Sequence, residues 1–351
     1  MRITPRKVSG LVAATVALGL VAVACSSGGA KAITGSGSTF AQPVYTAWAQ
    51  NFVSAGGAQV NYQGVGSGAG IQNFANQTTA FGATDVPLQP DDPQPKGSYI
   101  QIPTMVGAVA ILYNVSGVQN GLKLDGATTA DIFLGTITKW NDPAIAKLNP
   151  GVNLPATTIS TVHRSDESGT TAVFTTWLSD ESSTWKSQIG SGKAVQWPGG
   201  SGANGSSGVA AAVKQTDGSV GYASQDYAVT SGLQSAAVQA PDGSFVSPTT
   251  DAMTAAAGGL KFPITADTNI LNSSASGAYP IATTTYVLIY TDQSDQKEAQ
   301  TVVSYFHYGL TKGQTQLKSL NYAPLPASIL AGALLELKKV KANGSAITPS
   351  P

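Results

Sequence analysis

Residues 34–48 read TGSGSTFAQPVYTAW, a turn rich in glycine and hydroxyl side chains that runs directly into an apolar helical pattern. In the second half of this stretch, and at one aromatic residue beyond its end, apolar side chains recur at the three- and four-residue spacing of a single helix face. These positions are Ala41, Val44, Tyr45, Trp48 and Phe52. We therefore expect a helix over residues 41–52 that begins immediately after the glycines and hydroxyls.

Two further segments have the same local design. Residues 64–70 read GVGSGAG and lead into Ile71, and residues 164–170 read RSDESGT and lead into residues 171–178. Backbone N–H groups at a helix start have no partner within the helix and lie at the positive end of its dipole. Glycine lets a ligand approach the backbone closely, and hydroxyls add donors. One such turn is typical of a helix cap, but three, one of them with Arg164, favour an oxyanion site.

The glycine-rich turns do not match a nucleotide site, because none is followed by Gly-Lys-Ser/Thr. His163, Asp166 and Ser168 supply the residue types of a serine hydrolase. Residues so close in sequence do not easily converge at a strand-to-helix turn, and no Gly-x-Ser-x-Gly elbow is present. We expect His163 on a strand beside the turn and His307 on a helix. A phosphatase that uses Ser168 is kept as an alternative function.

Short β-type runs alternate with amphipathic segments along the rest of the chain, which indicates an α/β architecture. The expected strands cover residues 60–65, 105–113, 220–222 and 286–290. Further helices are expected around residues 174–178, 302–306 and 329–337. The Gly/Pro/Asp-rich segments at residues 87–97 and 199–208 are expected to form surface loops.

Composition bounds the class of protein. The chain has 351 residues, 42% of them hydrophobic and 11% charged, which provides for a real core and favours two domains of roughly 100–200 residues each. Its 19 basic and 19 acidic residues balance, and no basic cluster occurs, which argues against a nucleic-acid partner. One Cys and two His exclude a disulfide framework and argue against a metal site. We expect no cofactor.

The N-terminus has the pattern of an export signal. Arg2, Arg6 and Lys7 precede an uncharged apolar run at residues 11–24, which is too short to span a bilayer comfortably. We expect residues 1–24 to be a signal peptide whose removal leaves 16 basic and 19 acidic residues, a net charge of −3.

The lone Cys25 follows the apolar run directly, in a context that resembles a bacterial lipobox. We expect its thiol to be acylated and residues 25–31 to form a tether, which would anchor the protein to the outer face of the cytoplasmic membrane. Ala22 and Ala24 would also suit ordinary signal peptidase, so secretion or a soluble periplasmic location is the alternative.

Ordered segments spread over nearly the whole mature chain are similar to the phosphate-binding lipoproteins of bacterial Pst-type ABC importers. The similar segments are residues 33–45, 62–67, 81–88, 134–140, 164–170, 218–222 and 279–281. The resemblance implies a two-lobed periplasmic-binding fold of type II, in which each lobe is a mixed sheet flanked by helices. It places two crossover strands near residues 103–107 and 281–285. Lobe 1 would then combine residues 32–104 with 285–351, and lobe 2 would cover residues 105–284.

The same resemblance implies a set of phosphate ligands. Backbone amides and hydroxyls would come from Ser38, Thr39, Phe40, Ser67, Ser168, Gly169 and Thr170. Arg164 would pair with the anion through its planar fork, oriented by Asp166. Asp85 would accept a proton from phosphate and reject sulfate, which carries none at neutral pH. Glu167 adds a negative charge beside this set, and we expect it to face solvent.

Taken together, these features predict a non-enzymatic, monomeric receptor that binds inorganic phosphate outside the cytoplasm and delivers it to ABC permease subunits. The ion would be enclosed by rotation of the lobes. The first alternative is a binder of another oxyanion or of a phosphate ester on the same fold. The second is the phosphatase based on Ser168, and the third is a surface protein for adhesion or signalling.

Overall fold

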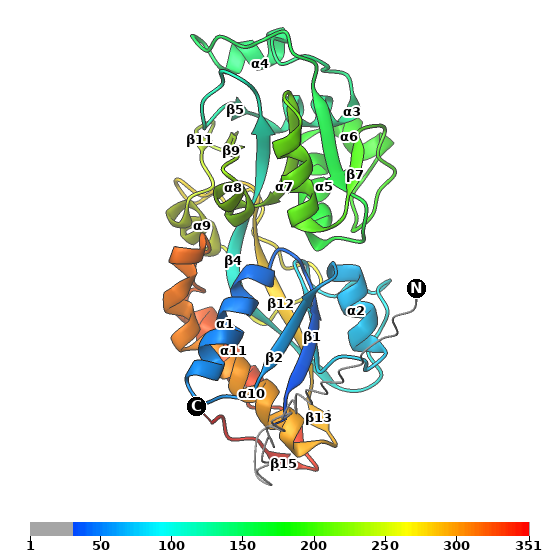
Figure 1. The fold of residues 1–351 in the computed structure, drawn as a ribbon, viewed down its shortest axis with the longest axis vertical. Helices are drawn as coiled ribbons and strands as arrows, with labels where there is room; N and C mark the ends of the chain where they lie inside the picture. The colour runs from blue at the N-terminus through cyan, green and yellow to red at the C-terminus, as the bar shows by residue number, and fades with distance from the viewer. Residues whose placement is uncertain (1–30, 351) are drawn as a thin grey trace, which may run out of the picture.

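Two lobes stack along the long axis of the molecule and are joined by the strands β4 (Tyr99–Asn114) and β12 (Ala282–Tyr290) (Figure 1). The structure is a computed structural model that describes residues 31–350. The predicted signal peptide, Cys25 and the tether up to residue 30 lie outside the described residues. Within residues 31–350, no helix has the length and apolarity needed to cross a membrane.

The first lobe is a sheet covered by helices, seen below the junction in Figure 1. Its strands, besides parts of β4 and β12, are β1 (Ile33–Gly37), β2 (Val60–Gly64) and β3 (Phe81–Thr84). Its helices are α1 (Gln42–Ser54), α2 (Ser67–Ala75), α10 (Gln296–Leu310), the 3₁₀ helix η1 (Lys312–Leu320) and α11 (Ala327–Leu337). A small sheet of β13 (Asp292–Gln293), β14 (Lys341–Ala342) and β15 (Ser345–Ala346) lies at its outer end.

The second lobe has the same layered design. Its strands are β6 (Ser160–Arg164), β7 (Ser201–Ala203), β8 (Ser219–Ser224) and β9 (Gln234–Ser235). Its helices are α3 (Gly126–Leu134), α4 (Pro143–Leu148), α5 (Gly169–Glu181), α6 (Ser183–Gln188), α7 (Gly205–Gln215), α8 (Gln225–Ser231) and, beside the junction, α9 (Thr250–Ala257). The strands β5 (Lys123–Leu124), β10 (Ala237–Gln239) and β11 (Phe245–Val246) form a separate small sheet.

One sheet runs through both lobes in the order β2-β1-β3-β12-β4-β8-β6-β7, with β9 paired to β4. The strands β4 and β12 are antiparallel partners, with Thr285 opposite Met105 and a register shift directly after Thr285. The β1 strand is parallel to both β2 and β3, and β6 is parallel to β8. Ligands of open α/β sheets bind beyond the carboxyl ends of parallel strands. We therefore expect a ligand-binding site at the carboxyl ends of β1, β3 and β6.

The strands and helices expected from sequence are present, with two corrections. Residues 34–37, expected to be part of a turn, belong to strand β1, where Gly35 leaves room for the Phe81 ring; a Cβ there would lie 2.0 Å from that ring. The expected loop at residues 199–208 contains β7 and the start of α7. Glycine and serine predict loops from composition alone, but here small residues serve strand pairing and a helix start.

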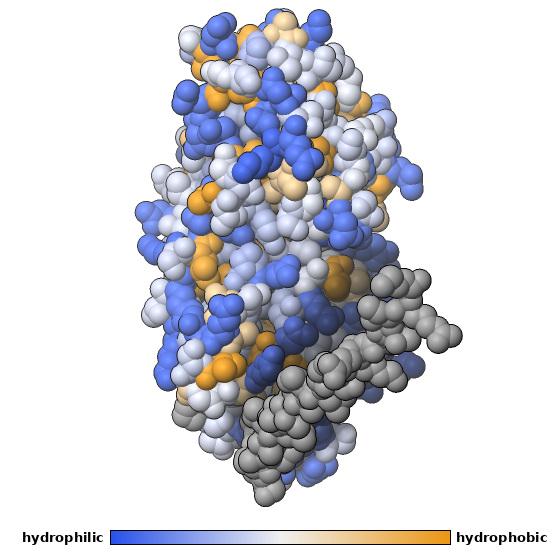
Figure 2. Space-filling model, in the orientation of Figure 1, coloured by the Kyte–Doolittle hydropathy of each residue, from blue (hydrophilic) through white to orange (hydrophobic). Residues whose placement is uncertain are grey.

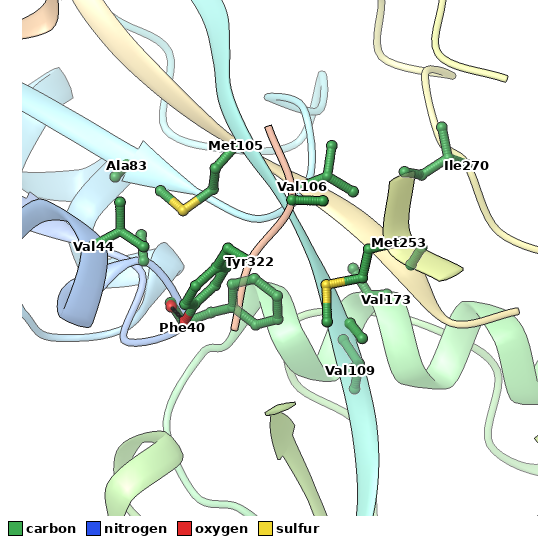
Figure 3. Packing of buried hydrophobic residues seen from close by; sticks show 14 of the residues in the cluster. Phe40, Val44, Ala83, Met105, Val106, Val109, Val173, Met253, Ile270 and Tyr322 are labelled. Atoms are coloured by element: carbon green, nitrogen blue, oxygen red, sulfur yellow. Dashed lines mark hydrogen bonds between the residues drawn. The ribbon is translucent and has the colours of Figure 1, made fainter. Parts of the chain in front are cut away.

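The core is continuous across the junction of the lobes. Figure 3 shows Phe40 and Tyr322 packed together near Met105 and Val106 of β4. On the face shown in Figure 2, apolar residues form only small, separated groups among polar ones, which is ordinary for a folded protein surface.

Phe81→Ala should lower the free energy of unfolding by about 3–5 kcal/mol, because the ring is fully buried. The Phe81 ring lies 4.8 Å from the Phe306 ring and stacks on Tyr62 at 6.0 Å. Val53→Ala, on α1 at a position 47% exposed, is the matched control and should change that free energy by no more than about 0.5 kcal/mol. Denaturant unfolding measures both, and equal effects would contradict this view of the core.

Candidate functional site

The predicted anion-binding residues lie where the two lobes meet. The turn after β1, the start of α2, the residue after β3 and the start of α5 converge there. The amide of Gly68 in the first lobe donates to the carbonyl of Glu167 in the second at 3.0 Å. A Cβ on Gly169 would lie 2.5 Å from Ser67 Oγ, so only glycine permits this approach of α5. The lobes are in direct contact around the site.

Asp85 occupies the centre of the site and is 1% exposed. Its Oδ1 accepts hydrogen bonds from the hydroxyls of Ser38 at 2.5 Å and Thr285 at 2.9 Å. Its Oδ2 accepts one from Thr170 of the other lobe at 3.2 Å. Burial raises the pKa of the Asp85 carboxyl, and these hydroxyls together with the positive charge of Arg164 oppose the rise. The carboxylate keeps a lone pair on Oδ2 for a donor from a ligand.

Arg164 ends β6, and its side chain is 1% exposed. Nε donates to Asp166 Oδ1 at 2.7 Å, and Nη2 pairs with Asp166 Oδ2. Burial pulls the pKa of Asp166 upward, but the hydrogen bond and charge of Arg164 and the amide of Gly205 outweigh it, so that pKa is lowered. Nη1 has only a long contact, 3.4 Å, with Ser206 Oγ. Asp166 thus fixes the guanidinium plane while part of its fork stays available to an anion.

The remaining predicted residues surround these two charges and are buried. The exposed fraction is 6% or less for each of these residues: Ser38, Thr39, Phe40, Ser67, Ser168 and Thr170. Helix α2 begins at Ser67, after Gly66 with a φ of 92°. A Cβ on Gly66 would lie 2.5 Å from Asp166 Oδ2, so glycine is required there by both backbone and space. The structure brings the predicted set together from both lobes; its role in binding stays a prediction.

Ser206 lies among the predicted site residues but was not predicted from the sequence. It is fully buried in the first turn of α7, its Oγ lies 3.0 Å from Thr39 Oγ1, and its amide donates to that same oxygen at 3.1 Å. Its neighbours, Gly205 and Ser207, repeat the glycine and hydroxyl pattern of the other three helix starts. The pattern was present, but assignment of residues 199–208 to a loop concealed the helix.

The side chains considered for a hydrolase are not arranged as a triad. The His163 ring stacks on Trp197 with centroids 4.8 Å apart, and its Nδ1 lies 3.0 Å from the Arg164 carbonyl. The Ser168 hydroxyl caps α5 by accepting the Thr171 amide at 3.1 Å. His163 lies on β6 and His307 on α10, as expected. Among the described residues, no group of three or more His, Cys, Asp or Glu side chains could hold a metal.

A cavity of about 720 Å³ adjoins the site and is lined by residues of both lobes, including Asp85 and Glu167. Lys193 Nζ pairs with Asp92 at 2.5 Å across one side of it. Glu167 is exposed, and its side chain lies against the Cα of Gly68. The cavity gives solvent a route toward Asp85.

Two lobes that share crossing strands and enclose a buried polar site define a solute-binding protein. Residues 22–307 match the family model described as a PBP superfamily domain. The phosphate-binding protein PstS of Xylella fastidiosa is 38% identical over 85% of this chain and 82% of its own length. PstS 2 of Mycobacterium tuberculosis is 36% identical over 87% of this chain and 86% of its own length. The chain belongs to the PBP superfamily and, within it, to the family of PstS phosphate-binding proteins.

Solved structures show the same fold. A periplasmic phosphate-binding protein determined with bound phosphate (PfluDING) is 25% identical, with a TM-score of 0.67, and covers 86% of this chain and 92% of its own. The phosphate-binding protein of Stenotrophomonas maltophilia has a TM-score of 0.68 at 20% identity, covering 87% and 94%.

Asp166→Ala should lower the free energy of unfolding by about 3–5 kcal/mol, because it leaves the buried Arg164 guanidinium without its carboxylate. Glu167→Ala is the matched control on the same turn, since that side chain is exposed, and should stay within about 0.5 kcal/mol of the parent protein. Chemical denaturation compares the two. A loss no larger for Asp166→Ala than for Glu167→Ala would show that the ion pair does not support the site.

Proposed function

We propose that this protein binds inorganic phosphate between its lobes and presents it to the permease subunits of an ABC importer. The observation that carries the proposal is the pairing of opposite charges in one buried site, Arg164 with a free part of its fork and Asp85 with a free lone pair. The relatives that bear the name of phosphate-binding proteins support the same ligand. Because the chain belongs to a solute-binding family, we infer that it binds its ligand without catalysing a reaction.

The chemistry of Asp85 selects the ligand. A buried carboxylate repels an anion unless the anion donates a proton to it. Monohydrogen phosphate carries such a proton at neutral pH, whereas sulfate carries none. A phosphate monoester above its second pKa of about 6 also lacks one. Asp85 therefore favours inorganic phosphate over both rival ligands.

Attraction of the anion does not require a basic surface. Helices α2 and α5 both begin at the site, and α7 begins beside it, so the positive ends of three helix dipoles face the same small volume. Arg164, which is buried, adds a full positive charge there. A protein of low net charge can bind a dianion in this way.

The division into lobes stays as predicted from sequence, with residues 32–104 and 285–351 in lobe 1 and residues 105–284 in lobe 2. Thr285 of β12 pairs with Met105 of β4. The two proposed lobe boundaries, which lie directly before these residues, are therefore opposite each other in the shared sheet, and this supports the division. Rotation about these strands would open the site. From the N-terminal sequence pattern we also infer an exported protein anchored through a lipid on Cys25. We expect it to act as a monomer.

Isothermal titration calorimetry with phosphate, sulfate and phenyl phosphate at about pH 8 tests this ligand assignment. Phosphate should bind. The other two anions should bind at least about tenfold more weakly, because neither has a proton to donate to the buried Asp85 carboxylate. Absence of heat with phosphate, or equal affinity for sulfate, would refute the proposed function.

Asp85→Asn should reduce the preference for phosphate over sulfate by at least about tenfold, because an amide donates to an unprotonated anion oxygen. Asp91→Asn, an exposed aspartate that lines the neighbouring cavity, is the matched control and should leave the preference unchanged. Competition binding of the two anions measures it. Unchanged selectivity in Asp85→Asn would remove Asp85 from the mechanism of discrimination.

A further inference from the structure

Tyr322 links the C-terminal part of the chain to the anion-binding turn. The backbone beside it pairs with β4, where Val106 and Ala323 exchange hydrogen bonds of 3.0 and 2.8 Å. Its ring packs edge-on against Phe40 with centroids 5.7 Å apart, as Figure 3 shows. Phe40 belongs to the predicted phosphate-binding turn. The position of Tyr322 is therefore tied both to a crossover strand and to the site.

The Tyr322 hydroxyl meets two oxygen acceptors at short range. One is the carbonyl of Phe40 at 2.5 Å, and the other is Oδ1 of Asp226, in α8 of the second lobe, at 2.6 Å. The side chain of Tyr322 is 1% exposed and that of Asp226 is 4% exposed. The next residue of α8, Tyr227, donates its hydroxyl to the carbonyl of Thr39 at 3.1 Å. We call Asp226, Tyr227 and Tyr322 the clasp, because they hold the carbonyls of Thr39 and Phe40 in the turn.

The clasp requires a proton on Asp226. A phenol has one proton and can satisfy only one of two acceptors at such distances. A carbonyl has no proton to give, so if Tyr322 donates to Phe40, the second short contact needs a donor on Asp226. An ionised Asp226 would draw the phenol proton to itself and leave the Phe40 carbonyl facing a lone pair. The neutral acid fits both contacts.

The surroundings of Asp226 favour the neutral acid. Burial raises the pKa of Asp226 to about 7, although hydrogen bonds from Ser224, Tyr322 and the first amides of α8 oppose the rise. None of the ion pairs within residues 31–350 involves this carboxyl.

The titratable groups that face Asp226 are the two tyrosines of the clasp, and their own pKa values are raised by burial and by Asp226. Helix α8 packs against α7, β8, β4 and β9. Lys214 of α7 is exposed, and Tyr222 of β8 is hydrogen-bonded to Thr171 at 2.7 Å instead.

We propose that phosphate binding is coupled to uptake of a proton at Asp226, which positions the Phe40 turn through Tyr322 when the lobes close. The inference rests on the proposed function, because the turn that the clasp holds is the predicted phosphate-binding turn. Asp226 and Tyr322 act as positioning residues. They do not contact the anion themselves.

The sign of the coupling follows from the two states. With the lobes apart, water reaches the carboxyl and its pKa returns toward the ordinary value of about 3.9. The closed state, with its pKa of about 7, then binds the proton more tightly. Protonation of Asp226 therefore makes its full contribution to the free energy of closure at pH values below the open-state pKa. This contribution is lost as pH rises toward about 7. At about pH 6, closure should take up nearly one proton at Asp226.

Calorimetric titration with inorganic phosphate at about pH 6, in buffers of different ionisation enthalpy, measures this proton. Phosphate and Asp85 also exchange protons, so the parent protein is compared with Asp226→Asn, whose amide can donate to Tyr322 permanently. The parent should take up close to one proton more per phosphate bound. Asp180→Asn, an exposed aspartate on α5 of the same lobe, is the control and should match the parent.

Equal proton uptake by the parent and Asp226→Asn would overturn the inference while leaving the proposed function intact. If neither protein binds phosphate, the proposed function itself fails. Should Asp226→Asn not fold, the ¹³Cγ resonance of Asp226 in the parent protein decides, because phosphate should shift its titration upward toward about pH 7. A titration that phosphate does not move would equally overturn the inference.

Tyr322→Phe provides an independent test, since it removes the hydroxyl and keeps the ring. The Phe40 carbonyl then loses its donor, and affinity for phosphate should fall about tenfold. Phosphate affinity equal to that of the parent would show that the clasp does not position the turn.

Discussion

The hydrogen bonds of the buried Asp85 carboxyl are the interaction on which the architecture of the site depends. Its donors come from the turn after β1, from the crossover strand β12 and from α5 of the second lobe. A carboxyl placed in a dry interior is costly unless donors surround it. Because these donors belong to both lobes, the carboxyl has all three of them only when the lobes meet. The carboxyl that we propose selects the ligand thus also stabilises contact between the lobes.

Arg164 balances this buried negative charge, and Asp166 in turn holds Arg164. With two carboxylates, Asp85 and Asp166, and one guanidinium, Arg164, the site carries a net charge of −1 before any anion enters. We therefore infer that the amides at the starts of α2 and α5 supply much of the attraction. Close approach of these helices depends on glycine, as the space around Gly169 and Gly66 shows. The low charge of the chain, 11% of residues, is therefore compatible with binding of a dianion.

Individual helices, strands and glycine-rich turns could be predicted from sequence because their signals are local, whereas the two-lobed fold and Asp85 were implied only by the resemblance to a family. Helical spacing after residue 40 predicted α1, and hydroxyl and glycine residues at helix starts predicted the turns that we propose bind the anion. Pairings between distant segments leave no such trace. The contact of Ser206 with Thr39 and the clasp of Asp226 and Tyr322 arise only when the sheet joins both lobes. The composition of residues 199–208 predicted a loop, which was wrong, because the small residues there form strand β7 and the start of α7.

We propose that Asp85 and Arg164 share one bound phosphate, with a proton between the anion and the carboxyl. A neutron crystal structure of the phosphate complex decides this, because it locates the proton itself. We expect a phosphate oxygen within hydrogen-bond distance of Asp85, the proton between them, and Arg164 on another oxygen. Phosphate bound away from Asp85, or separated from it by water, would rule out this role of Asp85.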